Sequence, residues 1–222
     1  NLLPSDTIGQ EHYASLFSPE KTQSSDVFVR INEEATETNI SEVSLGKGGM
    51  GNILLGAQNI PRRDIAVKTL IEDSKNHRAI LLQEANTMGK LEHPNIIPIH
   101  QVLINEDQQI QIVMKRVQGD TLKSFSKDQA LTGEKLRQSI NILIRVCHAL
   151  EFAHSHSIIH RDIKAENIML GSFNEVYLMD WGLAVDTSLK TTRKGIVGTP
   201  HYMAPEMLLG DPSLLDVRTD IF

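Results

Sequence analysis

Two neighbouring motifs constrain this chain more than any other feature. Residues 160–167 read His-Arg-Asp-Ile-Lys-Ala-Glu-Asn, and residues 180–182 read Asp-Trp-Gly. Asp162 is a carboxylate that can act as a general base, while Asn167 and Asp180 offer the oxygen ligands that Mg²⁺ takes. Each motif alone would be an ordinary surface turn. Together, in this order and spacing, they match the parts needed to move a phosphoryl group from ATP to a hydroxyl.

A glycine-rich segment lies upstream, where residues 46–51 read Gly-Lys-Gly-Gly-Met-Gly. Its glycines let a backbone close over phosphates without a Cβ in the way. The same G-x-G-x-x-G pattern marks dinucleotide-binding folds, in which it lies between a strand and a helix. Here strand-like segments, 40–45 and 52–57, flank it on both sides. The sequence therefore favours a hairpin over a nucleotide rather than a dinucleotide-binding fold.

A third strand-like segment, residues 64–70, contains Lys68. A lysine within an apolar strand is costly unless it has a partner. Residues 74–91 have helical periodicity, and Glu84 lies on the same face as the apolar residues at positions 81, 88 and 91. We predict that Glu84 is the counterion of Lys68. Without the flanking motifs, a solvated Glu84 at the edge of this face would be the better interpretation.

With these motifs the chain resembles eukaryotic-like (Hanks-type) protein serine/threonine kinases, bacterial members most of all, from about residue 40 to residue 222. The resemblance implies an α+β, two-lobed protein-kinase fold over residues 39–222. A small β-rich lobe with one main helix is expected at about 39–114. A helical lobe, incomplete at its C-terminal end, is expected at about 118–222. The polar residues 1–38 are expected to form a flexible leader.

The resemblance also assigns roles to residues. Asp162 is expected to accept the hydroxyl proton, Lys164 to neutralise charge on the moving phosphoryl group, and Lys68 to position the phosphates. The implied catalytic set is Asp162, Lys164, Asn167, Lys68 and Glu84. ATP is the expected nucleotide. Mg²⁺ is the expected metal, with Mn²⁺ as an alternative, and its implied ligands are Asn167 and Asp180.

The nucleotide is expected to lie between the glycine-rich segment and a hinge that follows residues 112–114. Met114 is the expected gatekeeper, and the backbone at Lys115 and Val117 is expected to hydrogen-bond the adenine. The implied nucleotide-binding set is Gly46, Lys47, Gly48, Gly49, Gly51, Ile53, Ala66, Lys68, Met114, Lys115, Val117 and Met169.

Substrate recognition is expected around residues 198–206, Gly-Thr-Pro-His-Tyr-Met-Ala-Pro-Glu, which resemble the peptide-docking end of the family's activation segment. Lys164 and Thr199 are features of serine/threonine rather than tyrosine kinases. Glu166 is expected to lie beside the substrate residues that precede the acceptor. We therefore predict a mild preference for Arg or Lys upstream of the target hydroxyl, unless Glu166 is simply solvated.

The middle of the same loop is basic and contains Thr191 and Thr192. A phosphate there would add close to two negative charges, which Arg161 and the nearby basic side chains could bind. Such binding would order the loop. We predict activating autophosphorylation at Thr191 or Thr192, with a dimer as the arrangement that permits it in trans. The alternative is that both are ordinary loop residues.

Two departures from the family pattern concern the hinge and the second motif. Lys115 and Arg116 stand where the family usually has an acidic residue followed by an aromatic one, which changes the charge at the mouth of the pocket. Trp181 replaces the usual Phe. This replacement is expected to be tolerated because the side chain packs rather than reacts.

Composition excludes several other classes. A net charge of −6 gives no electrostatic footprint for nucleic acid, and no run of about 18 apolar residues predicts a membrane span.

The single cysteine, Cys147, excludes an internal disulfide and suits a reducing cytosol. We therefore expect a cytoplasmic protein, or the cytosolic portion of a membrane-anchored one. Cys147 lies in a helical stripe with Leu136, Ile140, Leu143 and Leu150 and is interpreted as a core residue.

The chain stops at Phe222, where the family's central helix has only begun, so we interpret it as part of a longer kinase. Glu206 then has no visible counterion, and the Leu136–Leu150 stripe would be exposed.

His154 and His156 form an H-x-H pair, but a structural role is favoured over metal binding. The alternatives to an active kinase acting on proteins are a pseudokinase or regulatory scaffold, or a fragment that is inactive through truncation.

Overall fold

The computed structural model describes residues 38–47, 51–104, 109–127, 132–189 and 195–222. The N-terminal part of this described region is a five-stranded antiparallel sheet with the order β1-β2-β3-β5-β4. The predicted strand–glycine loop–strand hairpin is present as β1 and β2. The bounds of the strands are β1 Thr38–Lys47, β2 Gly51–Gln58, β3 Arg63–Leu70, β4 Ile99–Ile104 and β5 Ile110–Lys115.

The centre of this sheet is apolar. It is formed by β3, which lies between β2 and β5. Ile65 and Val67 of β3 are fully buried, as is Val113 of β5. Along β3, the register places Lys68 opposite Ile53 of β2 and Ile112 of β5. The lysine is thus fixed in the middle of the sheet, on the face opposite Val67.

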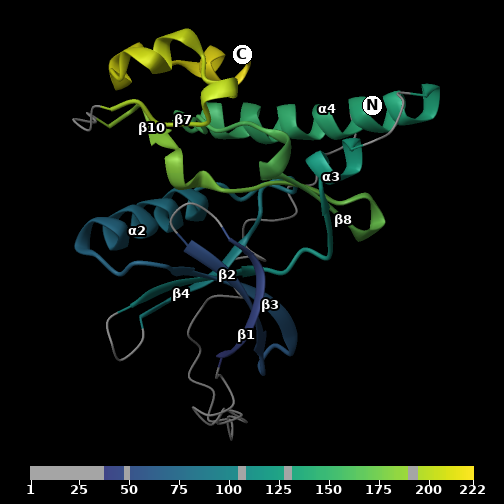
Figure 1. Ribbon diagram of the computed structural model, residues 1–222, viewed down its shortest axis with the longest axis vertical. Helices are drawn as coiled ribbons and strands as arrows, with labels where there is room; N and C mark the ends of the chain where they lie inside the picture. Colours follow the sequence, from purple (N-terminus) through teal and green to yellow (C-terminus); the bar gives the residue numbers. More distant parts are fainter. Residues whose placement is uncertain (1–37, 48–50, 105–108, 128–131, 190–194) are drawn as a thin grey trace, which may run out of the picture. The chain divides into compact units, whose positions relative to one another are not determined.

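One helix, α2 (Lys75–Gly89), contacts the sheet (Figure 1). The Ser74 side chain caps its N-terminus by accepting a hydrogen bond from the His77 backbone N–H. Its buried residues are Leu81, Glu84, Ala85 and Met88. The predicted helical face is therefore confirmed, and Glu84 is buried on it rather than solvated.

The C-terminal part of the described region contains the longest helix, α4 (Gly133–Ser155), and the short helix α3 (Leu122–Ser126) (Figure 1). Two small sheets, β6-β8-β9 and β7-β10, accompany them. The remaining strands are β6 Gly119–Thr121, β7 Ile158–Ile159, β8 Ile168–Gly171, β9 Val176–Leu178 and β10 Val185–Asp186. Short 3₁₀ turns complete this part, including 165–167, 181–183, 200–202, 205–209 and 217–220.

A single hydrophobic cluster joins the sheet to the helical part. It includes Ala66 and Ile112 from the sheet, Met88 from α2, and Val146 and Ala149 from α4. A parallel bridge between Ile96 and Leu178 links the segment after α2 to β9. The two-lobed arrangement of a β-rich part with one main helix and a helical part agrees with the predicted fold.

The predicted burial of Cys147 is wrong, because Cys147 is exposed on α4. Leu136, Ile140 and Leu143 of the same stripe are about half exposed, as expected for an uncovered stripe. The buried face of α4 is formed instead by Ile142, Val146, Ala149, Leu150 and Ala153. Both faces are apolar, so periodicity identified the helix but not the side that packs.

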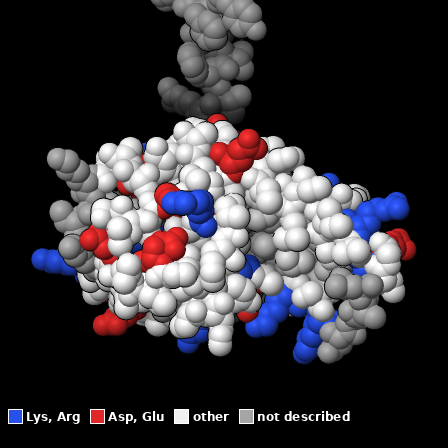
Figure 2. All heavy atoms as spheres, turned by 90° about the horizontal axis from the view of Figure 1, so that it is seen from above, with Lys and Arg blue, Asp and Glu red and all other residues white. Residues whose placement is uncertain are grey.

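Acidic and basic side chains are interspersed on the face that Figure 2 shows, with no broad field of one sign. Electrostatic arguments on this face therefore depend on individual ion pairs. Within the described ranges, no helix has the length and apolar character needed to cross a membrane.

Candidate active site

The predicted ion pair between Lys68 and Glu84 is present and involves a third residue. Lys68 Nζ lies 2.6 Å from Glu84 Oε1, 2.8 Å from Glu84 Oε2 and 3.0 Å from Asp180 Oδ1. The Lys68 and Glu84 side chains are 11% and 2% exposed, whereas that of Asp180 is 45% exposed. Burial lowers the pKa of Lys68, but the charges of Glu84 and Asp180 outweigh burial and raise it. Lys68 is therefore a fixed cation beside an accessible carboxylate.

The Asp162 carboxylate is surrounded by hydrogen-bond donors. Its Oδ1 accepts from the Thr199 hydroxyl at 2.6 Å, and its Oδ2 accepts from Lys164 Nζ at 2.6 Å and Asn167 Nδ2 at 2.9 Å. Lys164 also donates to Thr199 Oγ1 at 2.8 Å. Burial alone raises the pKa of Asp162, but these three hydrogen bonds outweigh it and hold the pKa below its ordinary value. Asp162 is thus held in its ionised form near neutral pH.

The candidate metal ligands Asn167 and Asp180 belong to segments that hydrogen-bond to each other. The backbone N–H of Met179 donates to the Asn167 carbonyl at 2.8 Å. Asn167 Nδ2 is directed at the Asp162 carbonyl and carboxylate, so Asn167 Oδ1 is the amide atom available as a ligand. Asp180 uses Oδ1 for Lys68, which leaves Oδ2.

These residues fit a magnesium–nucleotide complex better than a metal held by protein alone. Within the described residues, no group of three or more His, Cys, Asp or Glu side chains could hold a metal. Mg²⁺ usually takes one or two protein oxygen ligands and completes its shell with substrate phosphates and water. One amide oxygen and one half-exposed carboxylate match that pattern.

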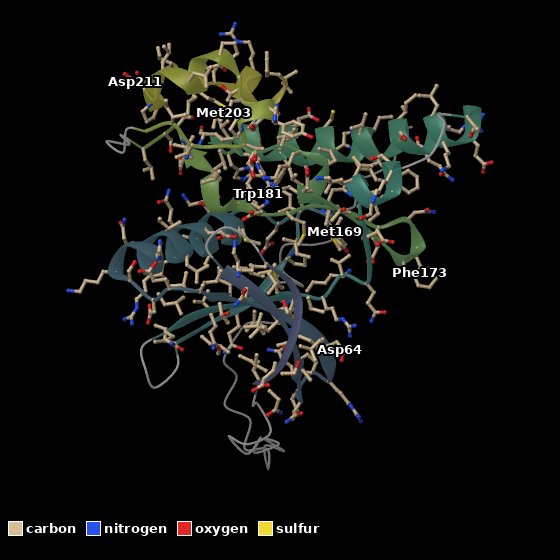
Figure 3. The ribbon with its side chains drawn as sticks, in the orientation of Figure 1. Asp64, Met169, Phe173, Trp181, Met203 and Asp211 are labelled. Carbon is tan, nitrogen blue, oxygen red and sulfur yellow. The ribbon has the colours of Figure 1, made fainter. Side chains whose placement is uncertain are left out.

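The apolar members of the predicted nucleotide-binding set pack in one cluster. Ala66 and Met114 are buried opposite each other in β3 and β5, and Ile53, Val117 and Met169 are partly buried against the same hydrophobic cluster. Figure 3 labels Met169 on β8. Partly buried apolar side chains at the edge of a core can contact a planar base.

The described glycines of the loop differ in their surroundings. Gly46 has open space where a Cβ would lie, whereas a Cβ on Gly51 would come within 2.5 Å of the Thr69 carbonyl oxygen. Gly51 is therefore required by the close approach of β2 to β3. Gly48 and Gly49 lie outside the described residues, and Lys47 ends β1.

The unusual hinge charges are paired rather than free. Lys115 Nζ donates to Glu175 Oε1 at 2.6 Å and lies over the Tyr177 ring, 4.8 Å from its centroid. Arg116 pairs with Asp64 of β3. The predicted change of charge at the pocket mouth is therefore compensated by Glu175 and Asp64.

Trp181 packs as expected of a replacement for Phe. Its side chain is 1% exposed and packs against His160 with the two rings tilted by 60° and their centroids 4.5 Å apart. In Figure 3 it lies between α2 and the helical layer of α4, and its 3₁₀ turn contacts α2. No residue in the described ranges offers a hydrogen-bond partner to its Nε1. Trp181 therefore joins α2, which carries Glu84, to residues 160–167, the catalytic loop.

Asp220 anchors the catalytic loop, a role that sequence analysis did not assign to it. Its buried carboxylate accepts hydrogen bonds from the backbone N–H groups of His160 and Arg161, each at 2.8 Å, and contacts His154 Nε2 at 2.8 Å. Arg161 has a positive φ of 69° and donates from Nε to the Leu183 carbonyl at 2.6 Å. No local sequence pattern indicates this anchor, because Asp220 is 59 residues from Arg161 along the chain.

Two further expectations concern Glu206 and the histidine pair. Glu206 Oε1 accepts a hydrogen bond from the Thr219 hydroxyl at 2.7 Å. Thr219 is a neutral partner, so this contact does not contradict the expectation about a counterion. His154 binds Asp220, and His156 Nδ1 contacts the Phe152 carbonyl at 2.9 Å. Both histidines thus have hydrogen-bond partners within the protein, as a structural role requires, although one partner is an acid that the sequence did not place beside them.

The predicted substrate-side residues are only partly within the described structure. Thr199 joins the Asp162 network, as described above. Glu166 lies in the 3₁₀ turn of the catalytic loop, where Lys123 Nζ donates to its Oε1 at 2.6 Å. That hydrogen bond lowers the pKa of Glu166. Thr191 and Thr192 lie outside the described residues.

Comparisons with known proteins agree with this geometry. The family model described as "Protein kinase domain" matches residues 40–222. The chain is 37% identical to serine/threonine-protein kinase PknD of Protochlamydia amoebophila, covering 81% of this chain and 21% of that protein. It is 33% identical to PknD of Chlamydia abortus, covering 80% and 22%, and 31% identical to PknD of Chlamydia trachomatis serovar D, covering 80% and 23%. The chain thus spans about a fifth of the length of these relatives, and it belongs to the protein kinase family.

Proposed function

We propose that this chain catalyses transfer of the γ-phosphoryl group of ATP to Ser or Thr hydroxyls of proteins, with Asp162 as the base. The observation that carries the proposal is the 2.6 Å hydrogen bond from the Thr199 hydroxyl to Asp162 Oδ1. It supports the view that this carboxylate can take a proton from an aliphatic alcohol, because such contact distances are those of a general base and its substrate. The relatives' names add that they are serine/threonine kinases.

The residues divide the reaction between them. When bound, ATP would supply the phosphoryl group, and Mg²⁺, or Mn²⁺ in its place, would neutralise charge on its phosphates. Asp162 accepts the proton of the incoming hydroxyl while the new O–P bond forms and the bond to the leaving oxygen of ADP breaks. Lys164, 2.6 Å from Asp162 Oδ2, supplies positive charge beside the moving group. Asn167 and Asp180 would hold the metal, and Lys68 would hold the phosphates.

A scaffold without turnover is the competing function. A pseudokinase typically lacks the strand lysine, the catalytic-loop aspartate or the metal-binding aspartate. Here Lys68, Asp162 and Asp180 are all present, and Lys68 binds both Glu84 and Asp180. This connection supports turnover, since maintaining a buried cation between two carboxylates is costly in a protein that does not use it.

The full-length protein, incubated with ATP, Mg²⁺ and a mixture of Ser-, Thr- and Tyr-containing peptides, provides the test. Mass spectrometry should find phosphate on Ser or Thr, and chelation of the metal should stop transfer until Mg²⁺ is restored. Asp162→Asn and Lys68→Met should each lose about 10²–10³ in rate. Lys75→Met, which removes an exposed lysine from the start of α2, is the matched control. Equal transfer by wild type and Asp162→Asn would refute the assignment of the base, and ATP binding without transfer would favour the scaffold.

A further inference from the structure

The ion pair between Lys123 and Glu166 lies beside the catalytic loop and has no part in the mechanism above. Lys123 belongs to α3 and Glu166 to the 3₁₀ turn that follows Asp162, and these two elements are in contact. The Nζ–Oε1 distance is 2.6 Å, and the two side chains are 67% and 37% exposed. The pair is therefore open to solvent on one side and fixed to the catalytic loop on the other.

The second carboxylate oxygen of Glu166 has no side-chain donor among the described residues. Oε2 is out of contact with solvent, and besides Lys123 only the backbone of Glu166 itself acts on the carboxylate as a hydrogen-bond donor. A buried carboxylate oxygen without a donor is costly, and such atoms often mark a place that a ligand completes. Lys123 thus satisfies only one of the two oxygens, although a carboxylate can accept a guanidinium group on both.

The catalytic loop connects the pair to the peptide-docking segment. Lys164 lies two residues before Glu166 and is the N-cap residue of the 3₁₀ turn that contains it. Lys164 binds Asp162 and Thr199, and Tyr202 belongs to the 3₁₀ turn that begins immediately after Thr199. The pair therefore lies next to the position where the proposed function places the acceptor hydroxyl.

We infer that Lys123 determines specificity by occupying, within the protein, the position of a basic side chain of the substrate. The inference rests on the proposed function and deepens it by naming what limits substrate choice. Glu166 and Lys123 cancel each other's charge, so wild-type protein selects only weakly for a basic residue near the acceptor. Without the ammonium group, the Glu166 carboxylate attracts such a residue, and arginine benefits most because it can reach both oxygens.

Paired peptides test this in the full-length protein. Each pair has the same Ser acceptor and differs by Arg or Ala at one position, scanned on both sides of the acceptor. The measured quantity is the ratio of kcat/KM for the Arg peptide to that for the Ala peptide. Lys123→Met should raise this ratio about two- to fivefold at one upstream position, the range expected for a single exposed ion pair, and added salt should reduce the gain.

Three variants make the comparison specific. Glu166→Gln should remove any preference for Arg, and Lys123→Met/Glu166→Gln should behave like Glu166→Gln alone. Lys127→Met removes another exposed lysine at the end of α3 and should leave the ratio unchanged. An unchanged ratio in Lys123→Met, or an equal gain in Lys127→Met, overturns the inference.

Binding of the same peptides, measured by fluorescence anisotropy, separates this inference from the proposed function. Tighter binding of the Arg peptide to Lys123→Met without phosphoryl transfer by any variant would refute the kinase activity and support the subsite. Phosphoryl transfer by wild type would support the kinase activity. If, at the same time, the Arg-to-Ala ratios of binding and of kcat/KM were identical in all variants, the inferred subsite at Glu166 would be overturned.

Discussion

Replacing Lys68 by methionine should destabilise the region between β3 and α2 more than replacing Glu84 by glutamine does. Removing one partner of a buried ion pair typically costs about 3–5 kcal/mol, and both side chains are nearly inaccessible to solvent. Lys68→Met leaves Glu84 buried near Asp180 without a cation, so its loss at neutral pH should lie within that range. Glu84→Gln leaves Lys68 paired with Asp180 at 3.0 Å. The stability lost by Glu84→Gln should therefore be smaller, about 1–3 kcal/mol, as for a buried polar group left without its partner.

The stability lost by the Lys68→Met variant should also depend on pH. Burial and the charge of Asp180 raise the pKa of Glu84, and the variant lacks the Lys68 ammonium that opposes them. A carboxyl group whose folded-state pKa exceeds its unfolded value stabilises the fold fully only below the unfolded value, here about 4.5. The deficit relative to wild type should therefore be smallest near pH 4.5 and grow as the pH rises through the folded-state pKa.

Hydrogen exchange of β3 and α2 in the full-length protein, followed by mass spectrometry and corrected for the intrinsic pH dependence, measures this local stability. Lys68→Met/Glu84→Gln removes both charges and should recover part of the loss. Lys75→Met controls for removal of a lysine from the same region. Equal losses in the two single variants, or a deficit in Lys68→Met that does not change with pH, would refute the electrostatic argument.

The other predictions concern the catalytic loop and the activation segment. Asp180→Asn should lower phosphoryl transfer about 10²–10³-fold through loss of metal binding, and a rate close to that of wild type would contradict the metal assignment. Asp220→Asn should raise hydrogen exchange at the His160 and Arg161 amides and slow transfer, since one buried N–H loses its acceptor at a cost of about 1–3 kcal/mol; unchanged exchange would show that the anchor is unimportant. Thr191→Ala/Thr192→Ala should lower activity and abolish phosphate mapped to this loop, whereas full activity without any mapped phosphate in wild type would remove the switch.

The sheet and α2 could be predicted because their determinants are local. Ser74 caps α2, the apolar spacing defines its buried face, and Lys68 is implausible in a strand without a nearby acid. Each inference needs only residues close in sequence or a single pair. The proposed catalytic and metal-binding residues could be named from the sequence for a related reason, because their motifs are short and occur in a fixed order.

The wrong prediction and the contacts that were not predicted all depend on segments that are distant in the sequence. Cys147 lies on a helix with two apolar faces, and which face packs depends on what the fold brings against it. The acid that holds the loop, Asp220, is 59 residues from Arg161 along the chain. Lys123 and Glu166 are 43 residues apart, so their pairing follows only from the contact of α3 with the catalytic loop. No local pattern encodes these contacts.

Backbone strain explains why the distant contacts matter for the chemistry. Arg161 and Asp180 both have positive φ values, 69° and 58°, a conformation that costs non-glycine residues about 1–3 kcal/mol. Arg161 immediately precedes the proposed base, and Asp180 is the proposed metal ligand. Asp220 accepts from the Arg161 N–H, and Lys68 binds the Asp180 carboxylate. The orientation of the two carboxylates with proposed roles therefore depends on these partners. A substitution at Asp220 should reduce transfer even though the proposed mechanism gives Asp220 no contact with the nucleotide or the acceptor hydroxyl.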